Sequence, residues 1–229
     1  MMHEQAQRMQ AIVEDLLTLS TLESSPGSDP RAINMGALLQ KARQQIEALS
    51  GGRHVLEWHI DDTLDVLGAE TELTSALSNL LTNAVRYTPD GGTITVRWER
   101  EADGGARYSV QDTGIGIPAR HLPRLTERFY RVDRGRSRAV GGTGLGLAIT
   151  KHIAMRHDAE LLITSEPGKG SVFALRFPAE RIAIDSYREM INFIGDRDTT
   201  TKRILEEILA QEEEHADEFA DLLDGWIGE

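Results

Sequence analysis

The chain has 229 residues, a length that suits one large domain or two small ones. It has no cysteine, which excludes disulfides and thiolate metal sites, and its net charge of −12 argues against general nucleic-acid binding through a basic surface. It also lacks the run of about 18 apolar residues that a membrane span needs, and its first residues lack the apolar core of a signal peptide.

The charge is unevenly distributed along the chain. Residues 180–229 carry a net charge of −10, whereas residues 1–179 carry a net charge of −2. Such a shift in composition predicts a domain boundary near residue 180.

The first predicted element is a helix over residues 2–24. Apolar residues recur there at steps of three and four and form one stripe: Met9, Ile12, Val13, Leu16, Leu17, Leu19 and Leu22. Proline and glycine residues within 26–30 end the helix. Because an isolated helix cannot bury such a stripe, we expect it to pair with another helix, most simply that of a second copy.

Residues 31–178 alternate between strand and helix patterns. The predicted strands are residues 32–35, 54–60, 93–99, 107–111, 160–164 and 171–177. The predicted helices are residues 36–49, residues 70–87 and a glycine-led segment at 141–155. This mixture predicts an α+β sandwich with one sheet and helices on one face. After residue 180, two helical patterns at 180–194 and 200–226 predict an antiparallel helical hairpin.

Three polar segments in the body suggest a nucleotide site. The first holds Asn79 and Asn83, which lie four residues apart and so share one face of the predicted helix. Amide oxygens suit a Mg²⁺ ion that already carries phosphate charge. Taken alone, the two asparagines fit equally well as polar residues on the surface of an amphipathic helix.

The second segment is Asp112-Thr-Gly-Ile-Gly116, which follows a predicted strand. Its carboxylate could accept a hydrogen bond from an adenine amino group, although many turns share this pattern. The third segment, residues 141–147, has four glycines that lead into a helix. Free backbone N–H groups at such a helix start can bind phosphate, and the spacing fits neither a P-loop nor a dinucleotide fingerprint.

In this order the three segments resemble the N, G1 and G2 boxes of the GHKL ATP-binding domain, which has the Bergerat-type two-layer α/β sandwich. Residues 127–131 (Glu-Arg-Phe-Tyr-Arg) resemble the F box of sensor histidine kinases, and residues 168–173 resemble the closing segment of that domain. Residues 12–17 are similar to the second helix of the kinase dimerisation domain. The resemblance covers residues 2–178 and is strongest to phosphate-responsive sensor kinases.

The resemblance implies a role for each site residue. It implies that Asn83 ligates Mg²⁺ with support from Asn79, and that Asp112 recognises adenine beside Tyr87. Arg86 would contact phosphate. The remaining cofactor-binding residues that it implies are Gly114, Gly116, Gly142, Thr143, Gly144, Leu145 and Gly146. Residues 118–141 would form the ATP lid, whose cationic candidates are Arg131, Arg134, Arg136 and Arg138.

Asn79 separates two branches of the resemblance. GHKL hydrolases carry a glutamate at this position that activates water, and an asparagine cannot act as a base. The site therefore looks built to hold ATP for transfer, which argues against the alternative of an ATP hydrolase. None of the seven histidines stands in an HExRTP-like phosphoacceptor segment, so we expect no self-phosphorylation and phosphoryl transfer only in trans.

The acidic tail suggests a second kind of site. Glu212 and His215 lie on one helical stripe, and in a hairpin Glu180 would lie at a similar height. Residues 180–227 resemble the last two helices of a bacterioferritin and the two-helix encapsulated ferritins. That resemblance implies iron binding by Glu180, Glu212 and His215, half of a di-iron site that a second hairpin would complete. Equally, acidic helices often contain ExxH by chance, and a glutamate directly after residues 178–179 is typical of a helix start.

We therefore expect three segments: a partial dimerisation domain at 1–25, a GHKL catalytic domain at 31–178 and a ferritin-like hairpin at 179–229. The abrupt join at residues 178–180 suggests a chimera. The main prediction is an ATP–Mg²⁺-binding catalytic module of a two-component histidine kinase, a homodimer whose parent protein also engages a response regulator. The alternative is a scaffold whose hairpin dimerises around iron. The expected location is cytoplasmic, with a membrane-anchored parent and no membrane contact from this chain.

Overall fold

A computed structural model describes residues 2–24, 31–132, 142–179, 181–182 and 203–204 of the chain. The helices are α1 (Met2–Ser24), α2 (Met35–Ser50), α3 (Glu70–Tyr87), a short 3-10 helix η1 (Ala119–Arg124) and α5 (Gly146–Arg156). The strands are β1 (Arg31–Asn34), β2 (Val55–Ile60), β3 (Asp65–Gly68), β4 (Thr93–Arg100), β5 (Ala106–Asp112), β6 (Glu160–Glu166) and β7 (Gly170–Phe177).

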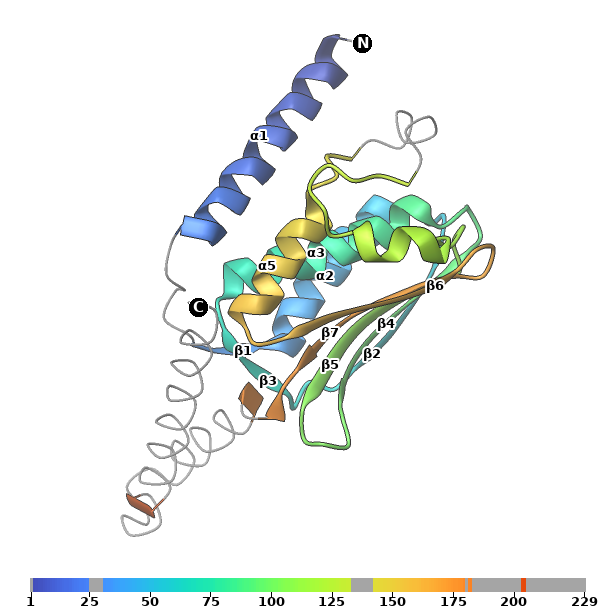
Figure 1. The fold of residues 1–229 in the computed structure, drawn as a ribbon. Helices are drawn as coiled ribbons and strands as arrows, with labels where there is room; N and C mark the ends of the chain where they lie inside the picture. Colours follow the sequence, from blue (N-terminus) through green and yellow to red (C-terminus); the bar gives the residue numbers. More distant parts are fainter. Residues whose placement is uncertain (1, 25–30, 133–141, 180, 183–202, 205–229) are drawn as a thin grey trace.

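A five-stranded mixed sheet forms one layer of the fold. Its strand order is β2-β4-β5-β7-β6, with β2 parallel to β4 and the other pairs antiparallel. The helices α2, α3 and α5 cover one face of this sheet, so the body has two layers (Figure 1). This agrees with the predicted α+β sandwich.

The core lies between these two layers. The face of the sheet that meets the helices contributes Ile94, Val96 and Trp98, all fully buried, because alternate residues of a strand point to the same side. Trp98 packs edge-on against Phe177 with ring centroids 5.8 Å apart, and its indole Nε1 donates to the carbonyl of Leu64 at 3.0 Å. This hydrogen bond satisfies a polar atom that would otherwise be costly to bury.

Local signals in the sequence set the bounds of α2. The Asn34 side chain accepts a hydrogen bond from the backbone N–H of Ala37 at 2.6 Å, which caps the first turn of the helix. Gly51 ends the helix in the left-handed conformation at φ 56°, which glycine adopts without steric cost. The observed α2 is one residue longer at each end than the predicted helix.

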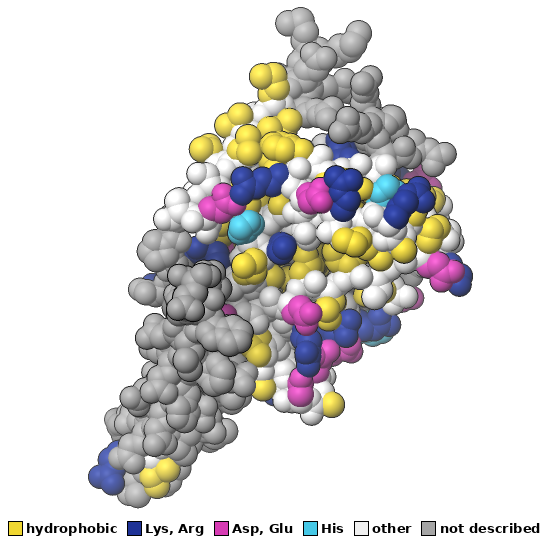
Figure 2. Space-filling view, in the orientation of Figure 1, with side chains coloured by type: hydrophobic (Ala, Val, Ile, Leu, Met, Phe, Trp, Pro, Cys, Tyr) yellow, Lys and Arg dark blue, Asp and Glu magenta, His cyan; other side chains and the backbone are white. Residues whose placement is uncertain are grey.

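Helix α1 lies outside the two layers and packs against α5 near its own C-terminal end (Figure 1). Of its apolar stripe, the C-terminal part is buried in this contact, at Leu19 and Leu22. The upper part stays exposed at four positions: Met9, Val13, Leu16 and Leu17. Figure 2 shows hydrophobic side chains gathered in the upper part of the molecule, where Figure 1 places α1.

Two features of the fold differ from the prediction. Strand β3 was not predicted, and it pairs antiparallel with β1 in a separate two-stranded sheet, so the body has two sheets and the expectation of one is wrong. Helix η1 was also not predicted, because it is short and contains Pro123. The predicted C-terminal hairpin lies almost wholly outside the described residues. Within those residues, no helix combines the length and the apolar character that a membrane crossing needs.

Candidate functional site

The site is organised along one face of α3, where the side chains of Asn79, Asn83, Arg86 and Tyr87 follow one another at helical spacing. The inward face of the same helix is anchored in the core by fully buried leucines, including Leu77, Leu80 and Leu81. Because these leucines fix the rotation of the helix, they also fix the direction of its polar face.

Asn79 joins α3 to the start of α5. Its side-chain Nδ2 donates to the carbonyl of Gly146 at 3.2 Å. A Cβ added to Gly146 would lie 3.1 Å from the Asn79 Oδ1, so the two helices meet closely at this point. Asn79 thereby sets the position of the helix that follows the glycine-rich segment.

Asn83 lies one helical turn further along α3 and is half-buried. Within the described residues, its side chain makes no hydrogen bond or ion pair. A half-buried amide without such a partner is available to a ligand, and its oxygen suits a hard cation such as Mg²⁺. The donor chemistry at this position therefore fits the metal that the sequence implied.

Two arginines converge on Gly142 in the glycine-rich segment. A Cβ added to Gly142 would lie 2.8 Å from Nη1 of Arg86 and 3.9 Å from Nη2 of Arg131, so a side chain here would displace the Arg86 guanidinium from its present position. Arg131 also donates from Nη1 to the Gly142 carbonyl at 2.5 Å. Burial lowers the pKa of Arg86, and the like charge of Arg131 lowers it further. An anion bound here would relieve this repulsion.

The C-terminal end of α3 meets the Asp112 segment. The Tyr87 carbonyl accepts a hydrogen bond from the Ile115 N–H at 3.3 Å. A Cβ added to Gly114 would collide with that carbonyl and with Oδ1 of Asp112, so glycine is required for this close approach. The Tyr87 side chain is partly exposed, as a residue at the rim of a pocket would be.

Asp112 is the buried carboxylate of the site, with 5% of its surface exposed. Burial raises the pKa of Asp112, while hydrogen bonds from the backbone N–H groups of Gly114 and Ser171 oppose that rise. The bond from Gly114 to Oδ1 measures 2.8 Å. A buried acceptor of this kind can read one donor of a ligand with high selectivity, because leaving it unpaired is costly.

The segment after η1 is fixed to the glycine-rich segment from the other side. The Phe129 N–H donates to the Gly144 carbonyl at 2.8 Å, and Phe129 itself has the unusual φ of 61°. The Tyr130 hydroxyl contacts Nδ1 of His121 at 2.6 Å, which ties the segment back to η1. These contacts hold the segment that carries Arg131 beside the glycine-rich segment.

Sequence reasoning missed the part that α1 plays. The Thr143 hydroxyl donates to Oδ2 of Asp15 at 2.5 Å, although the two residues are 128 positions apart. Glu23 of α1 contacts Arg128 and also lies 3.3 Å from Nε2 of His152. No local pattern signals such pairings, since they depend on how two distant segments dock.

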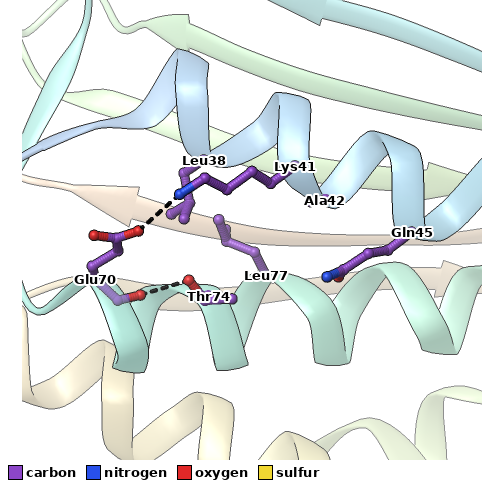
Figure 3. Close-up of a pocket in the computed structure, with 7 residues that line it drawn as sticks. All are labelled: Leu38, Lys41, Ala42, Gln45, Glu70, Thr74 and Leu77. Atoms are coloured by element: carbon purple, nitrogen blue, oxygen red, sulfur yellow. Dashed lines mark hydrogen bonds and ion pairs between the residues drawn. The ribbon is translucent and has the colours of Figure 1, made fainter.

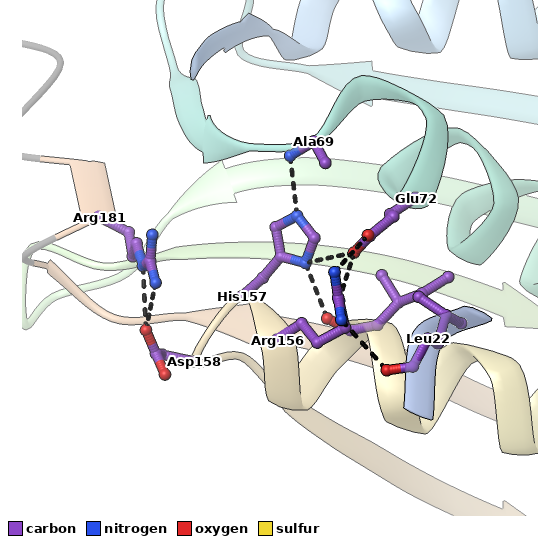
Figure 4. A network of polar contacts seen from close by, with 8 residues as sticks. Leu22, Ala69, Glu72, Arg156, His157, Asp158 and Arg181 are labelled. Atoms are coloured by element: carbon purple, nitrogen blue, oxygen red, sulfur yellow. Dashed lines mark hydrogen bonds and ion pairs between the residues drawn. The ribbon is translucent and has the colours of Figure 1, made fainter. Parts of the chain in front are cut away.

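Behind the site, a polar network ties α1, α3 and α5 together (Figure 4). Arg156 bonds Glu72 through two nitrogens at 3.0 and 3.1 Å and donates to the Leu22 carbonyl at 3.1 Å. Next to it, Nε2 of the buried His157 accepts from the Ala69 N–H at 3.0 Å, at the start of α3. Burial lowers the pKa of His157.

A separate hollow of about 160 Å³ lies between α2 and α3 (Figure 3). Leu38, Ala42 and Leu77 are among its lining residues, and the Lys41–Glu70 ion pair of 3.3 Å crosses it. It contains none of the predicted site residues, and it is smaller than the roughly 300 Å³ of a typical ligand pocket.

Some predicted residues lie outside the described part of the chain. These are the lid residues Arg134, Arg136 and Arg138 and the iron-binding candidates Glu180, Glu212 and His215. Among the described residues, no group of three or more metal-binding side chains is present.

Two known protein families match parts of the chain. Residues 68–181 match the family model described as "Histidine kinase-, DNA gyrase B-, and HSP90-like ATPase". The chain carries the ATP-binding domain of a sensor histidine kinase. Residues 169–226 also match the model of a ferritin-like domain. Because residues 170–177 form β7 within the main sheet, the shared stretch belongs to the kinase domain.

Individual relatives agree with the kinase assignment. The phosphate regulon sensor protein PhoR of Pseudomonas aeruginosa is 51% identical over 185 residues, which are 80% of this chain and 41% of that protein. The sensor-like histidine kinase SenX3 of Mycolicibacterium smegmatis is 35% identical over 176 residues, which are 76% of this chain and 46% of that protein. The chain thus spans less than half the length of these relatives.

Solved structures show the same fold. A mycobacterial sensor histidine kinase, MprB, aligns with a TM-score of 0.57 and 25% identity over 65% of this chain and 97% of that one. Full-length ShkA in complex with AMPPNP aligns with a TM-score of 0.67 over 76% of this chain and 36% of that one, at 24% identity, a likeness of fold alone. The predicted fold class is confirmed.

Proposed function

We propose that this chain binds Mg–ATP on the polar face of α3 and donates the γ-phosphoryl group to a histidine of a kinase dimerisation domain. The observation that carries this proposal is the convergence of three motifs on one helix: Asn79 meets Gly146, Arg86 meets Gly142, and the Tyr87 carbonyl meets Gly114. Through these pairings, the proposed metal ligand Asn83 on α3 would share one site with the proposed phosphate-binding segment and with the buried acceptor Asp112.

Each part of the site would hold one part of the nucleotide. Asp112 would accept from the adenine amino group, since its carboxyl oxygens are hydrogen-bond acceptors and the group is buried. Arg86 and Arg131 would neutralise phosphate charge beside Gly142. Asn83 would ligate Mg²⁺, which when bound offsets charge on the phosphates. Gly116, Gly144 and Leu145 would contribute to the same nucleotide site.

The site contains no base to activate water at the position where related hydrolases carry a glutamate. Asn79 stands there, and its Nδ2 is already engaged by the Gly146 carbonyl. An amide cannot accept a proton at neutral pH, so the chain's own residues favour retention of ATP until an acceptor approaches. In the transfer, the bond from the γ-phosphorus to ADP breaks, a bond to the imidazole nitrogen forms, and the imidazole proton leaves.

A transfer assay tests the proposal. A purified kinase dimerisation domain that carries a phosphoacceptor histidine is incubated with this chain, Mg²⁺ and γ-labelled ATP. We expect an acid-labile, alkali-stable label on the supplied domain, and none when Asn83→Ala replaces the parent chain. Nucleotide binding without any label on the domain would refute the transfer step.

The exposed upper stripe of α1 supports a further part of this proposal, that two copies pair through their helices. Met9 and Leu17 have 68% and 63% of their surface exposed, which is costly for large apolar side chains on one helix face. The parent protein would also engage a response regulator. Sedimentation of the chain should show a dimer, and Leu17→Glu should shift it to a monomer.

The ferritin-like match of residues 169–226 supports a second candidate function, binding of iron by Glu180, Glu212 and His215. Paired hairpins of two chains would supply the full ligand set. The test is the iron content of chains purified from iron-supplemented cells, with the double variant Glu212→Ala and His215→Ala as comparison. Iron retained by the parent chain and lost from the variant supports the site, and equal iron in both refutes it.

A further inference from the structure

Helix α1 reaches into the phosphate-binding segment of the domain. Asp15 is half-buried, and its Oδ2 accepts a hydrogen bond of 2.5 Å from the Thr143 hydroxyl. The same hydroxyl accepts from the Leu145 N–H at 3.2 Å, directly before the first residue of α5. A carboxylate is thus held at the N-terminal end of an 11-residue helix, where the helix dipole favours an anion.

The surroundings of this contact are also those of the proposed phosphate site. Thr143 follows Gly142, on which Arg86 and Arg131 converge. A bound polyphosphate and the Asp15 carboxylate would therefore seek the same positive region, and their like charges would repel each other. The contact as it stands satisfies part of the anion-binding capacity of the loop from within the chain.

The remaining contacts of α1 hold Asp15 in place. Two residues near the end of α1 bind the body: Glu23 contacts Arg128, and the Leu22 carbonyl accepts from Arg156 at 3.1 Å. Arg128 precedes Phe129, whose N–H donates to Gly144. The glycine-rich segment is therefore connected to α1 in two ways. Thr143 contacts Asp15 directly, and Gly144 is linked to Glu23 through Phe129 and Arg128.

From this geometry we infer that docked α1 is an autoinhibitory element: Asp15 acts as an internal anion at Thr143 that competes with the nucleotide phosphates, so that nucleotide binding and helix docking oppose each other. The inference rests on the proposed function, because it names the regulation of that nucleotide site. The coupling is reciprocal: if docking of α1 weakens nucleotide binding by some factor, then bound nucleotide weakens the docking of α1 by the same factor.

The charge of Asp15 can be removed without removing its hydrogen-bond acceptor. In Asp15→Asn the side-chain oxygen can still accept from Thr143, so the contact is kept while the negative charge that would repel the phosphates is lost. We expect the variant to bind Mg–ATP at least about fivefold more tightly than the parent chain, the lower end of usual coupling effects. This gain should shrink as salt is raised, since added ions screen the repulsion.

Glu14→Gln is the matched control, because it makes the same charge change one residue away. Glu14 is exposed and its side chain accepts from Gln10 on the helix surface at 2.8 Å. We expect calorimetry to give the control the affinity of the parent chain. Equal or weaker binding by Asp15→Asn would overturn the inference, as would an equal gain in both variants. If neither the parent chain nor Asp15→Asn binds Mg–ATP, the proposed function fails, and the inference fails with it.

A distance measurement tests the reciprocal effect. Because the chain has no cysteine, Thr18→Cys on α1 and Gln44→Cys on α2 can be spin-labelled selectively, and both positions are exposed. Labelled chains are diluted with unlabelled ones so that only distances within one chain count. We expect Mg–ATP to broaden or lengthen the distance distribution. A sharp, unchanged distribution at saturating nucleotide would contradict opposed binding even if affinities differ.

Discussion

Asn79 on α3 and Gly146 at the start of α5 are joined by a hydrogen bond of 3.2 Å, and this bond sets where the glycine-rich segment ends relative to the face of α3 that carries Asn83. The polar residue at this position therefore has a structural task besides any contact with the nucleotide. A glutamate at this position would be longer and negatively charged. While ionised it could not donate a hydrogen bond to the Gly146 carbonyl.

From this bond we predict the effect of Asn79→Ala. The Gly146 carbonyl would lose its side-chain donor, so we expect the free energy of unfolding to fall by about 1 kcal/mol. We also expect weaker Mg–ATP binding, because the loop would be less well positioned. Urea unfolding and calorimetry measure the two effects. A variant of unchanged stability and unchanged affinity would show that the bond is dispensable.

Asp112 predicts a trade between stability and binding. Burial in the folded state raises the pKa of this carboxyl above its ordinary value of 3.8. The ionised carboxylate therefore lowers the free energy of unfolding at pH values above the raised pKa. This destabilisation disappears below pH 3.8, where the carboxyl is protonated in both the folded and the unfolded state. We therefore expect Asp112→Asn to raise the Tm at neutral pH and to lose that advantage in acid. The same variant should bind ATP poorly, since an amide NH₂ would face the adenine amino group.

Asp90→Asn is the control for this prediction, because Asp90 is 76% exposed and lies 3.8 Å from Arg53 in an exposed ion pair. It should change neither the Tm nor the affinity appreciably. A lower Tm for Asp112→Asn at neutral pH would mean that the carboxylate stabilises the fold, contrary to this account.

His157 predicts a loss of stability in mild acid. It accepts from the Ala69 N–H through Nε2, so the folded state favours the neutral ring, and burial lowers its pKa from 6.5. The unfolded state therefore takes up a proton first, and stability should fall as pH drops through about 6.5 toward the lower folded value. The charges that act on the ring are those of Glu72, Arg156 and Arg181, and Arg181 is paired with Asp158 (Figure 4). Urea unfolding between about pH 7.5 and 5.5 should show a smaller loss for His157→Gln.

The Arg156–Glu72 pair predicts a large effect of one substitution. Both side chains are mostly buried, at 17% and 14% exposure, so Arg156→Met leaves an unpaired buried carboxylate. We expect a loss of about 3 kcal/mol in the free energy of unfolding, measured in urea. Lys169→Met breaks the exposed pair with Glu166 and should cost less than about 1 kcal/mol. Similar losses for both variants would argue against burial as the cause.

Much of the fold was predictable because its signals are local. The leucine pattern of α3 and the alternation in β4 and β5 fixed those elements to within a residue of the observed bounds. β3 was missed because its buried residues Val66 and Leu67 are consecutive and its partner β1 lies some 30 positions away. The small second sheet could not be inferred from either segment alone.

The candidate site shows the same division. The motifs at Asn83, Asp112 and Gly142 were visible as residue types at characteristic spacing, and the resemblance supplied their roles. The choice among lid arginines was not visible in the sequence, and of the four candidates only Arg131, which contacts Gly142, lies within the described residues. The Asp15–Thr143 bond was also beyond sequence reasoning, because it depends on the docking of α1 against α5.

Titration of the purified chain with Mg–ATP by calorimetry, alongside Asn83→Ala and the helix-surface amide control Gln44→Ala, tests the central claim most directly. The account predicts binding in the micromolar to low millimolar range for the parent chain and for Gln44→Ala, and no measurable binding for a still-folded Asn83→Ala. Equal affinity of all three chains for Mg–ATP would contradict the assignment of Asn83 as the metal ligand and, with it, this account of the site.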